Sequence, residues 1–172
     1  MGAGSSGSAI AYRLAQENNM KVLLIEYGGQ NRSVFIDMPA ALSYPMNLKK
    51  YNWGYRAEPE PNLYGRSLIC PRGKGLGGSS SINGMIYVRG HPQDFDNWST
   101  KGASSWSFAD VLPYFKKMEC CESRQSAWRG KNGPIRIKTA EQKNVLHKVF
   151  SDAAIQCGYS LTEDYNGYKQ EG

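Results

Sequence analysis

The chain has 172 residues, of which 40% are hydrophobic and 21% charged, a composition typical of a folded soluble protein and not of a disordered one. The net charge of +6 comes from scattered basic pairs and not from a stripe, which indicates a solvated surface and no nucleic-acid site. The N-terminus lacks a basic region followed by an apolar core, so we expect no signal peptide, and no apolar run approaches the ~20 residues of a membrane-spanning helix. The four cysteines and two histidines lack metal-ligand spacing, so we expect free thiols in a reducing compartment and no metal site.

The first elements along the chain predict a helix followed by a buried strand. Residues 8–18 carry apolar side chains at helical spacing, which places one apolar face on a sheet, and Asn18 and Asn19 end the helix. Residues 21–26 form a nearly continuous apolar run, as in a parallel strand that is buried on both faces, and Gly28 follows it.

The middle of the chain predicts a long functional loop. Residues 31–71 contain five prolines with aromatic residues between them, a pattern typical of a lid or binding loop. Further along we expect a helix at 108–118 with Ser107 as its N-cap, a half-buried strand at 134–138, and a helix at 145–157 that Gly158 ends.

Gly2, Gly4 and Gly7 have the spacing G-x-G-x-x-G at the start of the first predicted helix. In this fingerprint the first glycine allows a tight turn, the second lets the backbone approach a pyrophosphate, and the third allows close helix–sheet packing. The N–H groups at Ser5 and Ser6 lie where the positive end of the helix dipole would face the phosphates. The loop therefore predicts a dinucleotide site.

Glu26 ends the predicted strand 19 residues after Gly7, where this fingerprint has a carboxylate that accepts hydrogen bonds from a ribose diol. The fingerprint also requires a strand before Gly2, but only Met1 precedes it. Without that strand, the segment at 21–26 has an unpaired apolar edge. We therefore expect a chain that begins after the first strand of its fold.

A second glycine-rich loop at residues 73–83 would bring many backbone N–H groups near a polar ligand, and Asn83 offers both a donor and an acceptor. Extended to Asp96, this segment resembles the signature of the glucose–methanol–choline (GMC) oxidoreductases. Residues 24–29, 53–61 and 164–172 are similar to the same family, and the chain looks most like its choline dehydrogenase and alcohol dehydrogenase branch. The matching signature positions are Gly73, Lys74, Leu76, Gly77, Gly78, Ser79, Ser80, Ile82, Asn83, Tyr87, Gly90 and Asp96.

The resemblance implies an FAD-dependent oxidoreductase that transfers hydride from an alcohol carbon to flavin N5. It implies that Arg72 and Gly78 lie along the cofactor and that Trp53 belongs to a segment covering the flavin. Ile82 occupies the position where some members carry a histidine linked to FAD, so we expect non-covalent FAD. The residues implied to line the isoalloxazine ring are Asn83, Gly84, Met85 and Ile86.

The expected fold is α/β, with a Rossmann-like FAD-binding domain that lacks its first strand at residues 1–140 and the beginning of an α+β substrate domain at 141–172. The first domain includes the flavin-covering loop 31–71 and the signature loop 73–96. The resemblance implies that the catalytic histidine comes from a later part of the polypeptide. His91 and His147 match no catalytic motif, and we expect both at the surface. We therefore expect a cofactor-binding fragment, truncated at both ends, with no catalytic residue of its own.

The expected partners are a small-molecule alcohol and an electron acceptor of undetermined type, and no nucleic acid. We expect a cytoplasmic protein, and peripheral membrane association of the full protein stays open by resemblance to choline dehydrogenases. Two alternatives also stay open. One is an NAD(P)-dependent Rossmann dehydrogenase, which has no use for the second loop, and the other is a non-catalytic protein that keeps the FAD-binding fold.

Overall fold

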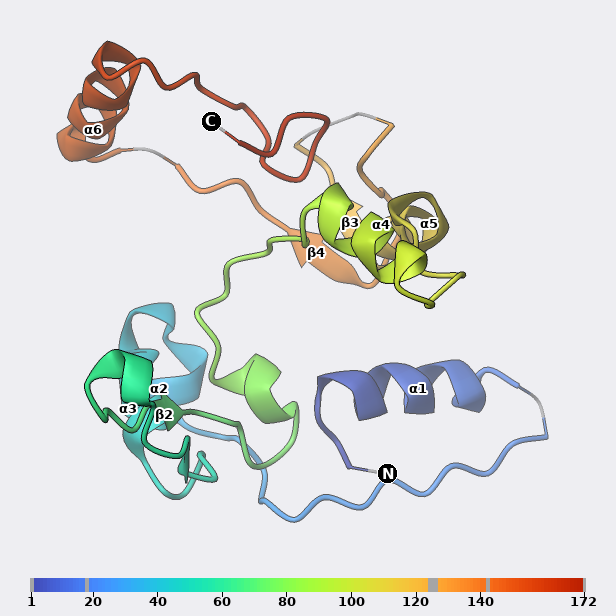
Figure 1. Cartoon of the computed structure of the whole chain (residues 1–172). Helices are drawn as coiled ribbons and strands as arrows, with labels where there is room; N and C mark the ends of the chain where they lie inside the picture. Colours follow the sequence, from blue (N-terminus) through green and yellow to red (C-terminus); the bar gives the residue numbers. More distant parts are fainter. Residues whose placement is uncertain (1, 18, 124–126, 142, 172) are drawn as a thin grey trace. The chain divides into compact units, whose positions relative to one another are not determined.

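The computed structural model describes residues 2–17, 19–123, 127–141 and 143–171. It divides into two compact units, Met1–Ile86 and Tyr87–Gly172. Figure 1 draws the first unit from blue to green and the second from yellow-green to red. The division between units falls inside the signature loop 73–96, whereas the expected boundary at residue 140 concerns functional domains and stays a prediction.

The first unit begins with helix α1 at Ser5–Ala15, which starts and ends earlier than the predicted 8–18. It starts earlier because Gly4 is its N-cap, and the Gly4 carbonyl accepts a hydrogen bond from Ser8 N at 2.9 Å. Asn18, the predicted end, lies outside the described residues. The first glycine loop therefore leads directly into the helix.

The predicted strand at residues 21–26 is wrong, because this segment belongs to no strand and pairs with none of the described residues. Three of its apolar side chains are exposed, Leu23 by 75%, Leu24 by 39% and Ile25 by 64%. A strand forms only beside a neighbour that takes up its backbone hydrogen bonds, and the described part of the chain supplies no such neighbour here.

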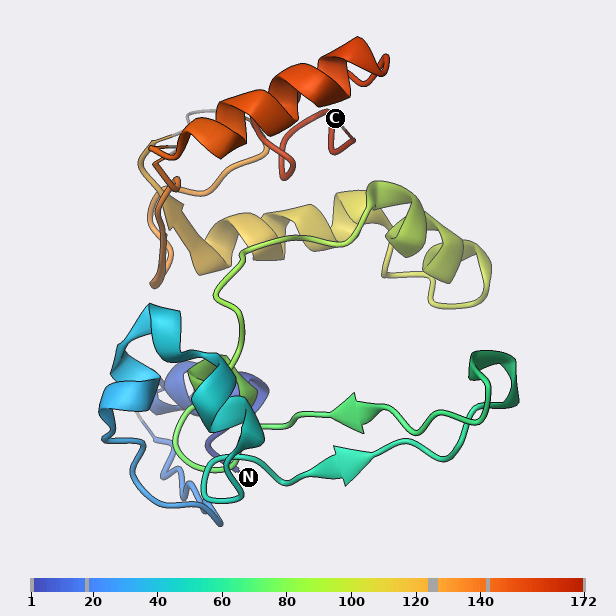
Figure 2. The same cartoon turned by 90° about the vertical axis from the view of Figure 1, so that its left-hand side faces the viewer.

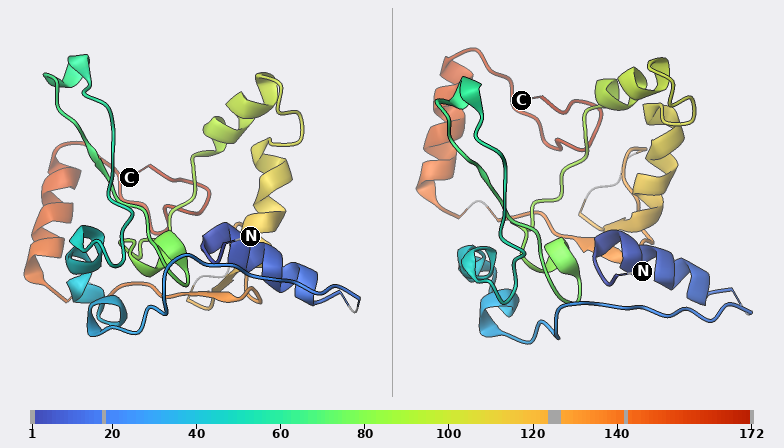
Figure 3. Two further views of the ribbon diagram at one scale, coloured as in Figure 1. Left: turned by 90° about the horizontal axis from the view of Figure 1, so that it is seen from below. Right: turned by 60° about the horizontal axis from the view of Figure 1, so that its bottom comes forward.

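Short helices and a two-stranded ribbon make up the stretch 31–71. The helices are α2 (Val34–Asp37), η1 (Pro39–Ala41) and α3 (Ser43–Asn47). Strands β1 (Tyr55–Arg56) and β2 (Ile69–Cys70) pair antiparallel, with η2 (Pro61–Leu63) between them. Figures 2 and 3 show this ribbon extending away from α2 and α3 as an arm with η2 at its tip. A further turn, η3 (Gly78–Ser81), lies in the second loop.

The second unit combines helices with one parallel pair of strands. Its elements are α4 (Pro92–Thr100), α5 (Phe108–Met118), β3 (Glu119–Cys121), β4 (Ile135–Ile137) and α6 (Val145–Gln156). Strands β3 and β4 pair in parallel, with Glu119 opposite Ile135 and Cys121 opposite Ile137. Phe95 of α4 is buried, and its ring packs against Trp98, Phe108 and Phe115 at centroid distances from 5.4 to 6.2 Å.

Most sequence expectations for the second unit are confirmed. The helix predicted at 108–118 has both predicted ends, and Ser107 is its N-cap in a capping box with Asp110. Strand β4 lies within 134–138, and α6 ends one residue before the predicted 157, with Gly158 following at a φ of +88°. Helix α4 overlaps the last residues of the expected signature loop 73–96 and extends beyond it, and Pro92 at its first position is a helix-start signal.

A buried charge cluster lies at β3. Glu119 is fully buried, and its Oε1 lies 3.0 Å from a terminal nitrogen of Arg89 and 3.2 Å from Nε of Arg129. The side chain of Asn166 accepts a hydrogen bond from Arg89 N at 2.8 Å and donates one to Tyr87 O at 2.9 Å. The segment 164–172, singled out in the sequence by its family resemblance, therefore contains a residue that anchors the backbone after the second loop.

Candidate dinucleotide-binding site

The N-terminus of α1 is open to an anion. Gly4 makes no side-chain cap for the first N–H groups, and a Cβ placed on Gly4 would meet nothing within 4 Å. Ser5 and Ser6 are exposed in the first turn, while Gly7 is half-buried inside the helix. Because uncapped N–H groups at a helix start attract phosphate oxygens, this backbone is suited to a pyrophosphate.

Glu26 connects the first glycine loop to the second. Its Oε2 accepts a hydrogen bond from Ala3 N at 2.9 Å, and its Oε1 accepts from Gly28 N and Gly75 N, both at 3.0 Å. The N–H of Gly28 is the largest cause that lowers the pKa of Glu26, with Ala3 and Gly75 adding to it against the opposing effect of burial. Glu26 is therefore held as a carboxylate between three backbone segments.

The second loop packs directly on the first. Gly77 N donates to Ala3 O at 2.7 Å, and Gly4 and Gly77 form a parallel bridge. A Cβ on Gly78 would come within 2.8 Å of the Cα of Gly4, and Gly78 has a φ of +53°. Since both the close approach and this dihedral favour glycine, the two loops form one backbone surface.

Two further approaches leave no room for a side chain. A Cβ on Gly28 would lie 2.4 Å from Gly75 N, and a Cβ on Gly73 would lie 2.0 Å from Gly78 O. Both distances are far shorter than any contact between atoms that are not bonded. The segment after Glu26 and the second loop therefore touch through their main chains.

The side chain of Asn52 anchors the backbone just before the second loop, a role that the sequence motifs do not indicate. It is 6% exposed, its Oδ1 accepts from Arg72 N at 2.9 Å and Gly54 N at 3.0 Å, and its Nδ2 donates to Met46 O. Trp53 N also donates to Arg72 O at 3.0 Å. The bond from Gly54 N back to Asn52 is an Asx turn, so an asparagine two residues before a glycine is a signal that could have indicated this role.

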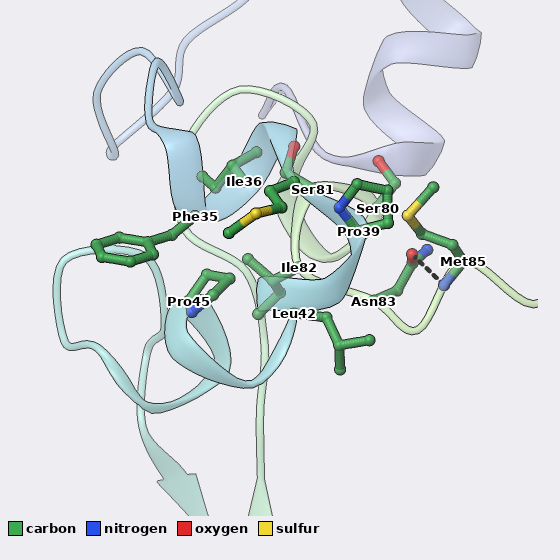
Figure 4. A pocket seen from close by; sticks show the side chains of 11 residues that line it. Phe35, Ile36, Pro39, Leu42, Pro45, Ser80, Ser81, Ile82, Asn83 and Met85 are labelled. Carbon is green, nitrogen blue, oxygen red and sulfur yellow. Dashed lines mark hydrogen bonds between the residues drawn. The ribbon is translucent and has the colours of Figure 1, made fainter.

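A pocket of about 210 Å³ lies between the short helices and the second loop (Figure 4). The amide of Asn83 accepts a hydrogen bond from Met85 N at 3.0 Å, and Met85 has a left-handed φ of +59°. An apolar wall with a few polar groups is typical of small-molecule sites. The lining residues are Phe35, Ile36, Met38, Pro39, Leu42 and Pro45 from the short helices and their connections, and Ser80, Ser81, Ile82, Asn83 and Met85 from the second loop and the residues after it.

Comparison with known proteins identifies the family of this chain. The family model described as GMC oxidoreductase matches residues 2–172. The chain belongs to the GMC oxidoreductase family. The family resemblance of the sequence is thereby confirmed.

Relatives of this GMC chain match its whole length and are much longer. It is 55% identical over 172 residues to the oxygen-dependent choline dehydrogenase of Brucella melitensis. The matching region makes up 100% of this chain and 31% of the Brucella protein. The chain therefore spans about a third of the length of the curated relatives that it matches.

Two solved structures resemble the chain closely. Pyridoxine 4-oxidase from Mesorbium loti superimposes with a TM-score of 0.86 at 35% identity, over 94% of this chain and 32% of that one. An FAD-dependent oxidoreductase from Chaetomium thermophilum gives a TM-score of 0.83 at 29% identity, over 95% of this chain and 30% of that one. The expected α/β class of an FAD-binding domain is confirmed by this likeness, although the strand predicted at 21–26 is not.

Within this GMC chain, the structure brings several predicted site residues together. A Cβ on Gly2 would lie 3.7 Å from Oε2 of Glu26, and Gly4 touches Gly78. Asn83 and Met85 share the pocket. Gly2, Gly4, Glu26 and Gly78 thus lie at one backbone surface, and their roles toward a cofactor stay predictions.

Other predicted residues lie apart from the pocket. Gly84 and Ile86 are exposed and do not line it. The Trp53 ring lies against the ring of Tyr27 at 4.8 Å, and the Arg72 guanidinium donates to the neighbouring carbonyl of Pro71 at 2.8 Å.

Both histidines lie on the surface, as expected. His91 is the N-cap of α4, where its Nδ1 accepts a hydrogen bond from Gln93 N at 3.2 Å, and His147 is exposed on α6. The four cysteines are free thiols. In the described ranges no group of His, Cys, Asp and Glu side chains could hold a metal ion, and no helix there has the length and apolar character needed to cross a bilayer.

Proposed function

We propose that the protein containing this chain is an FAD-dependent oxidoreductase that oxidises the CH–OH group of a small alcohol. The observation that carries the proposal is the surface formed by the first loop, Glu26 and the second loop in a member of the GMC family. Family membership favours this function over a nicotinamide-dependent dehydrogenase, because that class has no use for the second loop.

The residues present fit FAD on two structural grounds. The space beside Gly4 is open, so a pyrophosphate can approach the start of α1 without meeting a side chain. Among the described residues Oε2 of Glu26 accepts one hydrogen bond, from Ala3 N. Because a carboxylate oxygen can accept two, a ribose hydroxyl can still bind there.

Each predicted residue has a place in this proposal. Glu26 binds the ribose, while Arg72 and Gly78 lie along the cofactor. The segment after Ile82 would hold the isoalloxazine ring, and Asn83 and Met85 of this segment line the pocket. The pyrophosphate site comprises Gly2, Gly4, Ser5, Ser6 and Gly7, and the ring-lining segment comprises Asn83, Gly84, Met85 and Ile86.

When bound, FAD would supply the acceptor for the hydride of the alcohol, and the residues of this chain would bind and orient it. We assign the proton acceptor to no residue of this chain. Ile82 is aliphatic and 4% exposed, so its side chain offers no nucleophile for a covalent bond, which supports non-covalent FAD.

The substrate that we propose is choline or another primary alcohol, on the strength of the 55% identity to an oxygen-dependent choline dehydrogenase. Residues 1–140 form the FAD-binding domain of this proposal, and residues 141–172 begin the substrate domain. The free thiols support a cytoplasmic location. Peripheral membrane association and the electron acceptor are open to assay with vesicles, oxygen and quinones.

The test uses the protein expressed from its complete gene. It should show a flavin absorption spectrum that bleaches when choline is added without oxygen, and acid precipitation should release FAD into the supernatant. Flavin that stays with the precipitate would contradict the non-covalent cofactor. A protein that carries no flavin and instead reduces NAD⁺ or NADP⁺ would contradict the proposed function as a whole.

A further inference from the structure

Two amide side chains from the segment 164–172 hold the backbone that directly follows the ring-lining segment. Asn166 accepts a hydrogen bond from Arg89 N at 2.8 Å and donates one to Tyr87 O at 2.9 Å. Nε2 of Gln170 donates to Arg89 O at 2.8 Å. We call Asn166 and Gln170 the amide clamp, because together they bond the carbonyl of residue 87 and both backbone groups of residue 89.

The amide clamp takes the place of a neighbouring strand. In a sheet, the backbone groups of an extended segment are bonded by the N–H and C=O groups of the next strand. Residues 87–89 belong to no strand of the described chain, and the amide of Asn166 serves as both donor and acceptor for them. Asn166 is 6% exposed and Arg89 is 4% exposed, so these bonds are shielded from water.

The ring-lining segment itself contains a strained residue. Met85 has a φ of +59°, in the left-handed region that a residue with a side chain rarely adopts. Its N–H donates to Oδ1 of Asn83 at 3.0 Å, the bond that Figure 4 draws as a dashed line. A strained conformation persists only where the surrounding contacts hold it. Asn83 holds Met85 from the N-terminal side.

The amide clamp holds the same stretch of chain from the C-terminal side. Only Ile86 separates Met85 from Tyr87, whose carbonyl is bonded to Asn166. Because the distance between consecutive Cα atoms is fixed at ~3.8 Å, a displacement of Tyr87 is passed on to Met85. The stretch 83–89 is therefore fixed at both ends, by the turn at Asn83 and by the amide clamp.

We propose that the amide clamp positions the ring-lining segment for hydride transfer to the flavin. Asn166 and Gln170 are positioning residues, since they act through the backbone of residues 87–89 and not on the flavin itself. Asn166 is the more important of the two, because it makes two of the three hydrogen bonds. This inference rests on the proposed function, since it takes the ring-lining segment as the support of the isoalloxazine ring.

The test uses the protein expressed from its complete gene, with its flavin and freed of it. In the flavin-free form of Asn166→Ala, hydrogen–deuterium exchange in residues 83–86 should be about tenfold faster, because the strained turn has lost its C-terminal support. In the flavin-loaded form, the visible spectrum should shift, and choline should reduce the flavin about tenfold more slowly, because the ring is no longer held in place. Gln170→Ala removes one bond where Asn166→Ala removes two, and it should change all three readouts in the same direction by less.

The matched control is Asn144→Ala. Oδ1 of Asn144 accepts a hydrogen bond from Leu146 N at 2.9 Å at the start of α6, so this variant loses the same kind of bond in the same unit. It should lower the unfolding midpoint while leaving exchange in residues 83–86, the flavin spectrum and the reduction rate unaltered. The same pattern in Asn166→Ala would show that Asn166 serves stability alone and would overturn the proposal.

Two further outcomes would also overturn the amide clamp. One is exchange that accelerates from residue 87 onward and stays unchanged in residues 83–86. The other is an unaltered reduction rate in Gln170→Ala in a background where Asn166→Ala does not fold. A protein that carries no flavin would contradict the proposed function, whereas faster exchange in residues 83–86 of that protein would still support the action of the clamp on this segment.

Discussion

Glu26 is the side chain on which the first unit's loop geometry depends most directly, since N–H groups from three segments converge on its carboxylate. Glu26→Gln keeps one acceptor oxygen but turns an NH2 group toward N–H donors. We expect it to lower the free energy of unfolding by about 1–2 kcal/mol, at the low end for charge-assisted bonds because the carboxylate is partly exposed. Thermal unfolding of the two proteins measures this difference.

The difference between Glu26→Gln and the unaltered protein should depend on pH. The pKa of Glu26 is lowered from 4.5 in the folded state, so its stabilisation is complete above that value and is lost as the pH falls through the lower folded pKa. The two unfolding midpoints should therefore differ at neutral pH and converge in acid. Glu17→Gln, at an exposed acid after α1, should change neither. A gap that stays constant with pH would show that the charge plays no part.

The spacing of Glu26 from the first glycines predicts a ribose ligand, but it cannot predict the bond to Gly75, which lies 49 residues away. That bond exists only once the second loop has folded onto the first. Asn52 illustrates the opposite case, because its Asx turn to Gly54 is local and could be inferred from sequence, whereas its bond to Arg72 could not.

The contact between the segment after Glu26 and the second loop offers a matched pair of substitutions. Gly28→Ala places a Cβ 2.4 Å from Gly75 N, whereas Gly29→Ala meets nothing within 4 Å. Neither glycine has a positive φ, so the two changes differ in packing and not in backbone strain. Gly28→Ala should lower the free energy of unfolding by about 1–3 kcal/mol, as overpacking does, while Gly29→Ala should be neutral or slightly stabilising.

Denaturant unfolding and FAD affinity together measure this pair. The displaced second loop in Gly28→Ala should also weaken FAD binding, since Gly75 and Gly78 belong to the same loop. Equal stabilities of the two variants would mean that the loop yields to the added methyl group without loss.

Elements differ in how far the sequence determines them. Helix α5 has both predicted ends because its signals are local, with the Ser107–Asp110 capping box at its start. The segment 21–26 has an equally clear apolar run, yet it forms no strand, because a strand depends on a partner elsewhere in the chain. The apolar pattern therefore predicts what a segment would do beside a sheet and not whether the sheet is there.

Each unit of the chain is organised around one carboxylate. Glu26 accepts backbone N–H groups in the first, and Glu119 faces two buried arginines in the second. The two sites differ in burial, since Glu119 is 0% exposed while Arg89 and Arg129 are 4% and 5% exposed. Removing one partner of a buried ion pair is more damaging than removing an exposed one, because the remaining charges stay buried without compensation.

Glu119→Gln should therefore lower the free energy of unfolding of the second unit by about 3 kcal/mol, and the loss should be local. Hydrogen–deuterium exchange should accelerate in residues 87–171, above all around β3 and the segment held by Asn166, and stay unchanged in residues 2–82. Glu122→Gln, an exposed acid three residues further along, is the matched control and should alter neither. Because the proposed FAD site lies in the first unit, FAD affinity should also survive Glu119→Gln. Exchange that accelerates equally in both units would contradict this prediction. It would mean that the two units, divided after Ile86, unfold together and not independently.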